Sequence, residues 1–266
     1  MLKDDVRTFW EKASCGGALY LEEDSIKGFQ NQSEKRYALE PYIIDFAAFD
    51  AWKDKRVLEI GVGLGADHQR FAENGAILYG IDLTERAVRL AKERLRLFGL
   101  HSTIEVGDAE ALRFANSSFD LVYSWGVIHH SPNTKQAAGE ILRVLRPGGK
   151  FRVMIYHKFS FVGYMLWIRY ALLKLKPWMS LAEIYSKYLE SPGTKAYTTS
   201  DAKKLFGGAS RISCRTVLTH GDLLTSDAGQ RHRGLMLTVA KLVWPRRLIQ
   251  MFFPNHGLFM LIEGEK

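Results

Sequence analysis

Hydrophobic positions along this chain follow two alternating patterns. Short, nearly continuous apolar runs alternate with longer stretches in which apolar residues recur every three or four positions. The first pattern is typical of strands covered on both faces, and the second is typical of amphipathic helices. Strands that alternate with such helices predict an α/β fold with a parallel sheet and right-handed crossovers. We expect strands over residues 57–60, 78–82, 104–110, 119–126, 151–156 and 212–219.

Residues with capping chemistry predict where two of the helices begin and end. Thr84 is suited to cap a helix over residues 85–98, and Gly99 is suited to end it. Ser131 is expected to cap a second helix over residues 132–146, because proline is favoured in the first turn. A Pro-Gly-Gly turn then leads into the fifth strand.

The segments outside the alternating core are expected to cover it. Residues 1–52 are expected to be mainly helical, since aromatic and aliphatic residues recur at helical spacing over 37–49. A second insertion, over residues 221–255, mixes arginines with aromatic residues. The predicted division is an N-terminal helical cover (1–52), a ligand-binding core (53–157), a helical lid insertion (158–210) and C-terminal strands with the second insertion (211–266).

The segment 161–173 at the start of the lid insertion is almost entirely apolar. A membrane-spanning helix needs about 18 or more uninterrupted apolar residues, and Arg169 interrupts this segment earlier. Arg169 and Lys176 are expected on one face of a helix whose remaining surface is apolar. The segment is therefore either a helix in the lid of a hydrophobic pocket or a helix lying on a membrane interface, and we favour the lid.

The most informative motif lies where the first strand ends. Residues 57–65 read Val-Leu-Glu-Ile-Gly-Val-Gly-Leu-Gly, an apolar run with an acid that breaks into alternating glycines. Gly61, Gly63 and Gly65 allow backbone N–H groups to approach a ligand at the start of the next helix. The motif alone is ambiguous, because it also satisfies the dinucleotide pattern G-x-G-x-x-A, with Asp82 at the spacing of a ribose contact.

Polar residues also follow the later strands. Asp82 stands at the tip of the second strand, where a carboxylate can accept hydrogen bonds from ribose hydroxyls, and Asp108 follows the third, where it suits an adenine amino group. Ligands of parallel sheets bind beyond the carboxyl ends of the strands, which is where these acids, the glycines and Ser124 fall.

Taken together, these motifs resemble the class I S-adenosylmethionine (SAM)-dependent methyltransferases, in particular their small-molecule, type 11 branch. The resemblance is close over residues 37–157 and looser over 256–262, which look like the family's last strand. It implies a doubly wound, mostly parallel seven-stranded Rossmann-like sheet, with SAM as the methyl donor. The cofactor-binding residues that the resemblance implies are Glu59, Gly61, Gly63, Gly65, Asp82, Leu83, Asp108, Ala109, Glu110, Ser124 and Trp125.

The reaction implied by the resemblance is an in-line displacement at the methyl carbon of the sulfonium, from which S-adenosylhomocysteine leaves. A base is required only where the acceptor loses a proton, and an imidazole suits that task near neutral pH. The candidate catalytic residues are His129, His130, Tyr156 and His157. Each histidine is equally well interpreted as a hydrogen-bonded loop residue.

Two further features of the site remain open at this stage. Trp125 is the candidate for an aromatic face beside the sulfonium, and packing in the core or against adenine is an equally good interpretation. No metal site is predicted, because the acid that binds a metal in some quinone-pathway relatives is replaced here by histidine.

Composition narrows the class of protein. The chain has 266 residues, of which 47% are hydrophobic and 25% charged, in keeping with a globular enzyme. Cys15 and Cys214 are the only cysteines, which excludes a disulfide framework or a four-cysteine zinc site. The first residues include acids and lack an apolar run, so neither a secretory signal nor a transit peptide is indicated and a cytoplasmic location is expected.

Charge is divided unevenly along the chain. Residues 1–156 hold 21 Lys and Arg against 22 Asp and Glu, whereas residues 157–266 hold 16 against 7, which together give the net charge of +8. The excess of positive charge in the second half is either a solvated basic surface or a contact with something anionic, such as a substrate phosphate or carboxylate or a membrane surface.

The acceptor is predicted to be a small, apolar or aromatic molecule. Methylases of nucleic-acid bases carry Pro-Pro-aromatic after an acid, Asn or Ser at the end of the fourth strand, whereas this chain reads Ser-Trp-Gly-Val. No RNA-binding motif is recognisable either, so no nucleic-acid partner is expected. Tyr164, Trp167 and Tyr170 of the lid are expected to line the pocket if they point inward.

Two alternatives stay open. The chain could bind SAM without turning it over, as a regulatory or scaffold subunit that engages a partner or a membrane surface through its basic C-terminal half. A nicotinamide-dependent oxidoreductase is a weaker alternative. The oligomeric state is not predicted.

Overall fold

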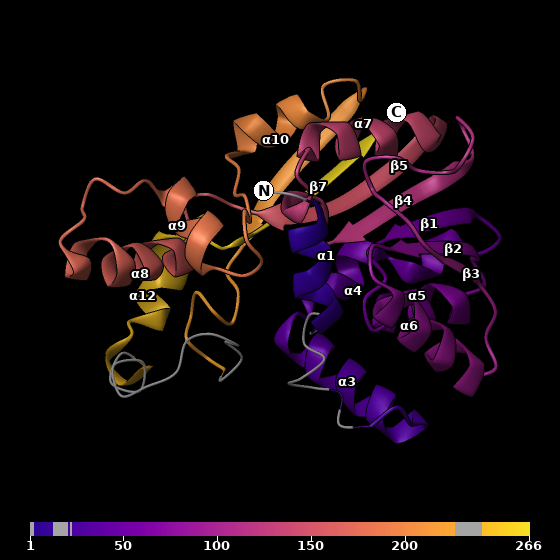
Figure 1. The fold of residues 1–266 in the computed structure, drawn as a ribbon, viewed down its shortest axis with the longest axis horizontal. Coiled ribbons are helices and arrows are strands. Elements are labelled where there is room, and N and C mark those ends of the chain that lie inside the picture. The colour runs from indigo at the N-terminus through magenta and orange to yellow at the C-terminus, as the bar shows by residue number, and fades with distance from the viewer. Residues whose placement is uncertain (1–2, 13–20, 22, 227–240) are drawn as a thin grey trace.

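The computed structural model describes residues 3–12, 21, 23–226 and 241–266, and a seven-stranded sheet with helices on both faces lies at its centre (Figure 1). The strand order is β3-β2-β1-β4-β5-β7-β6, and only β7 runs antiparallel to its neighbours. The predicted doubly wound, mostly parallel seven-stranded α/β sheet is thereby confirmed. The strands are β1 (Arg56–Ile60), β2 (Ile77–Asp82), β3 (Thr103–Val106), β4 (Phe119–Trp125), β5 (Leu145–Tyr156), β6 (Arg211–Val217) and β7 (Phe259–Glu265).

The order of the strands reverses between β1 and β4. Leu58 of β1 pairs with Tyr79 of β2 on one side and with Val122 of β4 on the other. The chain therefore leaves the two central strands in opposite directions, which opens a crevice beyond their carboxyl ends. This reversal places the glycine loop after β1 beside the loop after β4.

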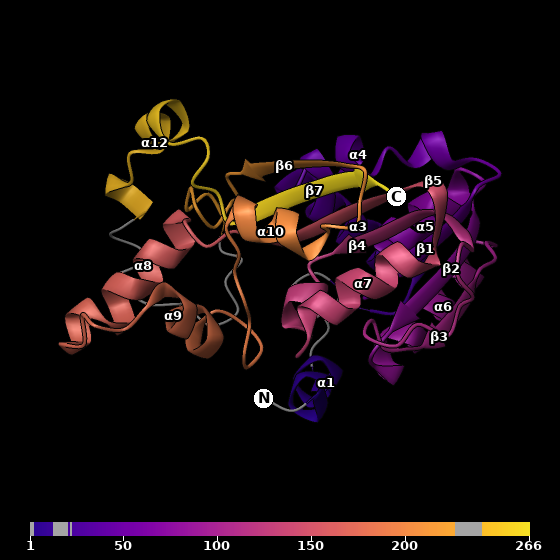
Figure 2. The same ribbon diagram turned by 90° about the horizontal axis from the view of Figure 1, so that it is seen from above.

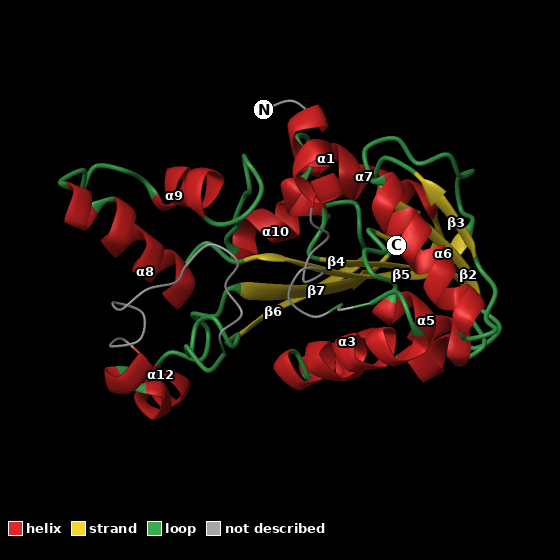
Figure 3. Ribbon diagram, turned by 60° about the horizontal axis from the view of Figure 1, so that its bottom comes forward, coloured by secondary structure: helices red, strands yellow, loops and turns green. Residues whose placement is uncertain are grey.

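Helices pack in two layers on the sheet (Figures 2 and 3). One face is covered by α4 (Tyr42–Ala47), the short helix η1 (Phe49–Trp52) and α5 (Ala66–Glu73), whose apolar residues pack with those of β1, β4 and β7. The other face is covered by α7 (Thr134–Val144) and α10 (Thr199–Leu205). Helix α6 (Glu85–Leu97) lies against β2 and β3, and α3 (Ile26–Leu39) contacts α4, α5 and α6.

The helix predicted over residues 85–98 is confirmed as α6. The side chain of Thr84 accepts a hydrogen bond from the backbone N–H of Ala87, and Gly99 follows the helix with a φ of +66°. The described part of residues 1–52 is mainly helical, as expected, and its helices are interrupted before Pro41.

The helix predicted over residues 132–146 is shorter than expected, and Ser131 does not cap it. Asn133 is the N-cap of α7, because the hydroxyl of Ser131 donates instead to Glu110. The helix ends at Val144 since Leu145 already pairs with Phe119 in the sheet. The predicted Pro-Gly-Gly turn therefore lies inside β5.

Two strand predictions also need correction. β3 ends at Val106, four residues before the predicted end, and a turn follows in which the backbone N–H of Ala111 donates to the carbonyl of Asp108. The last strand, predicted over 256–262, is β7 and begins at Phe259. The first change leaves Asp108 and Glu110 in the loop after β3.

The first insertion holds α8 (Phe161–Tyr170), the short helix η3 (Leu172–Lys174) and α9 (Leu181–Tyr188). Leu175 has a φ of +55°, so the helical path ends before Lys176. The prediction that Arg169 and Lys176 share one helical face was therefore wrong. Helix α10, within the same predicted insertion, packs on α7 and β6.

The second insertion includes α12 (Arg246–Phe252), and part of it, with Arg231 and Arg233, lies outside the described residues, as does Cys15. In the parts of the chain that the structure describes, no helix has both the length and the apolar character to cross a bilayer. The predicted four-part division of the chain stays a prediction.

Candidate functional site

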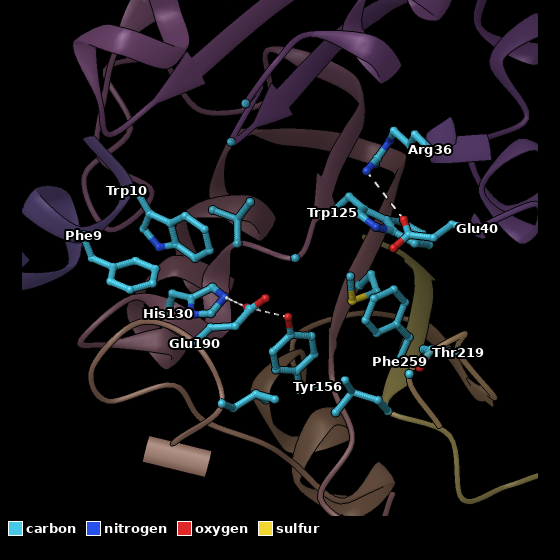
Figure 4. A pocket seen from close by; sticks show the side chains of 18 of the residues that line it. Phe9, Trp10, Arg36, Glu40, Trp125, His130, Tyr156, Glu190, Thr219 and Phe259 are labelled. Carbon is cyan, nitrogen blue, oxygen red and sulfur yellow. Dashed lines mark hydrogen bonds and ion pairs between the residues drawn. The ribbon is translucent and has the colours of Figure 1, made fainter. Parts of the chain in front are cut away.

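A cavity of about 690 Å³ lies beyond the carboxyl ends of the central strands (Figure 4). The glycine loop 61–65 lines one part of it, and His130, Tyr156 and the lid line another. Helix α1 (Lys3–Lys12) adds Phe9 and Trp10 to the wall. The cavity is thus enclosed by the sheet, the N-terminal helices and the first insertion together.

The glycine loop needs glycine for two different physical reasons. Gly61, Gly63 and Gly65 have φ angles of +82°, +53° and +76°, in the region that side chains disfavour. A Cβ atom at Gly61 would lie 2.2 Å from the side chain of Val127, whereas one at Gly63 would meet no atom within 4 Å. Gly61 therefore keeps the loops after β1 and β4 in contact, and Gly63 presents its backbone to open cavity space.

Asp82 lies at the tip of β2, as predicted, and lines the cavity beside Leu83. One carboxylate oxygen accepts from the backbone N–H of Gly63 at 3.1 Å. The other accepts from the backbone N–H and hydroxyl of Thr84, at 3.0 and 2.8 Å. Burial raises the pKa of Asp82 from its ordinary value, although these hydrogen bonds act in the opposite direction.

Asp108 and Ala109 line the cavity, but Glu110 does not. Lys3 of α1 contacts the carboxylates of both Asp108 and Glu110, and thereby holds α1 over this end of the cavity. Glu110 also accepts a hydrogen bond of 2.7 Å from the backbone N–H of Asn133. Its carboxylate thus fixes the loop before α7, while Asp108 remains beside the cavity.

Trp125 and Glu59 both line the cavity, whereas Ser124 is fully buried outside the lining. The ring of Trp125 stacks on Tyr42, with centroids 6.0 Å apart. Glu59 and Nδ1 of His68 share a 2.8 Å hydrogen bond, and burial raises the pKa of Glu59 well above its usual range.

The sequence analysis missed a buried arginine beside the glycine loop. Arg36 of α3 donates to both carboxylate oxygens of Asp67, at 3.0 and 2.7 Å, and its guanidinium lies 3.5 Å from Glu40. Its charged carbon lies 6.0 Å from the ring centroid of Trp125. All four side chains line the cavity. The spacing of four residues between Arg36 and Glu40 is typical of an ion pair on a helix. Nothing in the sequence indicates that Arg36 also contacts Asp67.

Glu40 has an unusual environment for a carboxylate. Burial raises the pKa of Glu40 to about 7, against the opposing effect of Arg36. Burial would also raise the pKa of Asp67, but the ion pair and hydrogen bonds from Arg36 hold it below its usual value. The two carboxylates around one guanidinium therefore differ in how readily they take up a proton.

His130 and Tyr156 meet a third polar group, Glu190, that the sequence analysis also missed. The hydroxyl of Tyr156 donates to the carboxylate of Glu190 at 2.6 Å, and Nε2 of His130 lies 3.4 Å from the same oxygen (Figure 4). Nδ1 of His130 contacts the hydroxyls of Ser191 and Thr194, at 2.8 and 3.1 Å. The loop after α9 therefore both orients the imidazole and places a carboxylate beside it.

The other two candidate histidines do not line the cavity. His129 is fully buried, and its ring lies 4.1 Å from those of both His130 and Tyr156. Burial lowers the pKa of His129 well below its usual value, and burial also lowers the pKa of His157. The ring of His129 therefore packs against His130 and Tyr156, which line the cavity.

The side chains of the lid that line the cavity differ from those expected. Tyr164, Trp167 and Tyr170 do not line the cavity, because Tyr164 hydrogen-bonds His256, Trp167 donates to the carbonyl of Met179, and Tyr170 stacks on Tyr188. The lining residues of α8 are Val162, Met165, Leu166, Ile168 and Arg169. The predicted lid helix is present, but it turns its aliphatic face inward.

A single buried carboxylate joins the lid to the sheet. Asp222 accepts hydrogen bonds from the backbone N–H groups of Val162, Thr219 and Leu258, at 3.1, 2.9 and 2.8 Å. These groups lie at the start of α8, after β6 and before β7. The position of the lid is therefore fixed from the second insertion.

Comparison with known proteins agrees with this geometry. The family model described as a methyltransferase domain matches residues 58–153. Over these residues the chain is similar to the SAM-dependent methyltransferases.

Two curated methyltransferases are similar to part of this chain. A phthiotriol/phenolphthiotriol dimycocerosates methyltransferase of Mycobacterium tuberculosis is 40% identical over 99 residues, which are 36% of each chain. Phosphoethanolamine N-methyltransferase 2 of Caenorhabditis elegans is 35% identical over 104 residues, 38% of this chain and 24% of the relative. The matched region thus spans about a third or less of these methyltransferases.

A solved structure has a similar fold over nearly the whole of this chain. Phosphoethanolamine N-methyltransferase 2 of Haemonchus contortus superposes with a TM-score of 0.60 over 98% of this chain and 60% of that one, at 18% identity. At this identity the superposition establishes the methyltransferase fold and leaves the acceptor open.

Proposed function

We propose that this protein transfers the methyl group of SAM to a small, largely apolar acceptor by in-line displacement. The observation that carries the proposal is the single cavity, in which the glycine loop and Asp82 share one space with His130, Tyr156 and an aliphatic lid. A donor and an acceptor can therefore be held side by side and shielded from water, which is the main catalytic requirement of this transfer.

The residues at one end of the cavity suit the donor. Gly63 leaves open space in front of its backbone, and Asp82 offers carboxylate oxygens at the tip of the neighbouring strand. Asp108 lies beyond the next strand, at the spacing that suits an adenosyl group. SAM supplies the activated methyl group, so the protein needs to bind, orient and exclude water rather than generate a reactive species.

The residues at the other end suit an acceptor that loses a proton. Glu190 lies within reach of Nε2 of His130, so that a proton accepted by the imidazole is stabilised by the carboxylate. Ser191 and Thr194 fix the ring through Nδ1. We assign His130 as the proton acceptor and Glu190 as the residue that positions it and balances its charge.

The lining of the lid suggests the character of the acceptor. Val162, Met165, Leu166 and Leu258 present aliphatic surface between the polar groups and the outside. Burial of apolar area supplies most of the affinity for ligands in such pockets, while a few polar groups fix orientation. An acceptor with an apolar body and one ionisable group fits this distribution.

The test is transfer of labelled methyl groups from SAM to a metabolite extract by the full-length protein. We expect label in a small molecule, and we expect His130→Ala to abolish incorporation while leaving binding of S-adenosylhomocysteine unchanged. His101→Ala is the matched control, because His101 is exposed and lies outside the cavity lining. Tight binding of S-adenosylhomocysteine without incorporation into any small molecule would overturn the enzyme assignment and favour a SAM-binding subunit.

A further inference from the structure

The exposed hydrophobic side chains of the described residues are concentrated on the two insertions. Leu175, Trp178 and Leu242 are 83%, 76% and 82% exposed, and Met251 and Phe252 are each 64% exposed. Isolated exposed apolar residues need no explanation, but a cluster of large ones marks a surface that contacts something else. We call the exposed side chains of residues 168–178 and 242–253 the apolar face.

The two segments of the apolar face lie at one end of the molecule. Figures 1, 2 and 3 all place α8 and α12 together, away from α5 and α6. An aromatic contact joins the two insertions, because the ring of Phe161 in α8 packs edge-on against Phe253, which follows α12. The exposed side chains of η3 and α12 therefore belong to the same end of the fold.

Charge on the apolar face has one sign. No aspartate or glutamate occurs in residues 158–182 or 241–262. The exposed cations Lys174 and Lys176 stand between Leu173, Leu175 and Trp178, and the exposed Arg247 stands beside Leu248. Leucine and tryptophan interleaved with lysine and arginine is the composition of surfaces that lie on anionic lipid headgroups.

The same face borders the cavity. Ile168 and Leu173 line the cavity and are nevertheless 46% and 57% exposed. Lys241 lines the cavity next to the exposed Leu242. An apolar molecule that leaves a bilayer under this face therefore meets apolar side chains that also line the cavity.

We propose that the apolar face docks on an anionic lipid surface and admits a membrane-resident acceptor to the cavity. The docking follows from the face itself, whereas the statement about the acceptor rests on the proposed methyl transfer. Helix α8 then lines the cavity, and the exposed residues 172–178 that follow it face the bilayer.

Charge argues against a second copy of this chain as the occupant. A symmetric dimer through this face would bring Lys174, Lys176 and Arg247 of each copy toward the same cations of the other, with no acids in either segment to balance them. Anionic headgroups supply that balance, and the acyl chains accept the leucine and tryptophan side chains.

The experiment is flotation of the full-length protein with vesicles of phosphatidylcholine alone or of phosphatidylcholine and phosphatidylglycerol in equal parts. We expect flotation with the anionic vesicles that weakens as salt is added. The double variant Leu175→Glu/Trp178→Glu should bind at least about tenfold more weakly, because two insertable side chains become charged. Ile26→Glu is the control for an added acid on an exposed apolar residue, because Ile26 is 46% exposed but lies on α3, outside the apolar face.

Binding of S-adenosylhomocysteine by each variant serves as the folding control and separates the two proposals. If the wild-type protein binds S-adenosylhomocysteine but does not float with the anionic vesicles, the docking is overturned and the proposed methyl transfer is not. Flotation of the double variant equal to that of the wild type also overturns it, as does a dimer in solution that the double variant dissociates. Vesicle binding by a protein that binds neither SAM nor its product overturns the methyl transfer alone.

The acceptor is tested with labelled SAM and a total lipid extract presented in the anionic vesicles. We expect label to partition into the organic phase and to fall in parallel with flotation in the double variant. The statement about the acceptor is overturned if the label stays in water-soluble products and the double variant forms them at the wild-type rate.

Discussion

The hydroxyl of Tyr156 donates a 2.6 Å hydrogen bond to the carboxylate of Glu190, which joins the end of β5 to the loop after α9. The same carboxylate lies 3.4 Å from Nε2 of His130. The contact therefore links the core of the methyltransferase fold to its lid at the point where the acceptor is proposed to lose a proton.

Glu190→Gln separates the charge of this side chain from its shape. Glutamine keeps an acceptor for Tyr156 but no longer stabilises a protonated His130. We expect kcat to fall by about 10²-fold or more, within the range for proton-transfer groups, while affinity for S-adenosylhomocysteine stays within about twofold. Steady-state kinetics and titration calorimetry measure both quantities, and an unchanged kcat would remove Glu190 from the mechanism.

Asp82→Ala tests the donor end of the cavity. Loss of hydrogen bonds to a charged acceptor costs about 1.5–3 kcal/mol, which corresponds to roughly 10- to 150-fold weaker binding of S-adenosylhomocysteine. Because Asp82 also accepts from Gly63 and Thr84, thermal unfolding must be measured alongside. Thr84→Val is the comparison variant, since it leaves the Asp82 carboxylate in place while it removes the hydroxyl contact with Asp82 and the N-cap hydrogen bond from Ala87. Equal affinity in Asp82→Ala and the wild type would show that the ligand does not contact this carboxylate.

Alanine at two glycines should have different effects. Gly61→Ala places a Cβ 2.2 Å from Val127 at a φ of +82°, so we expect a loss of about 2–4 kcal/mol in the free energy of unfolding. Gly63→Ala has only the backbone penalty, about 1 kcal/mol, and its Cβ enters the open cavity. Gly63→Ala should therefore weaken ligand binding more than stability, and chemical denaturation with calorimetry distinguishes the two. The reverse order of stabilities would contradict the described packing of the loop.

The raised pKa of Glu40 has a consequence for stability. Burial places the folded-state pKa at about 7, above the ordinary value of 4.5, so the proton is held more tightly in the folded protein. The stabilisation is full below about pH 4.5 and is lost as pH rises toward 7, with a total on the order of 3 kcal/mol. Relative to Glu40→Gln, the wild type should therefore become less stable across that interval. Parallel denaturation curves of the two proteins from pH 4.5 to 8 check the sign, and a constant difference would contradict it.

The sequence predicted those parts of the fold that depend on neighbours along the chain. The glycine loop and the acids after β2 and β3 follow directly from strands with continuous apolar runs, and Thr84 caps the helix that follows it. Ser131 failed as a cap because its hydroxyl is taken by Glu110, 21 residues away.

The acceptor end could not be predicted in the same way. Glu190 reaches Tyr156 across 34 residues and lies in a loop without a motif. Tyr164, Trp167 and Tyr170 are apolar enough for a pocket wall, yet each finds a partner elsewhere in the insertions. Which face of a nearly uniform apolar helix turns inward depends on tertiary contacts such as those of Asp222, which local spacing does not encode.

Titration calorimetry with S-adenosylhomocysteine tests the central claim most directly. The account predicts saturable binding of one molecule per chain, weakened by Asp82→Ala and not reproduced by NADH. Absence of binding by either SAM or S-adenosylhomocysteine, or tighter binding of NADH than of both, would contradict it.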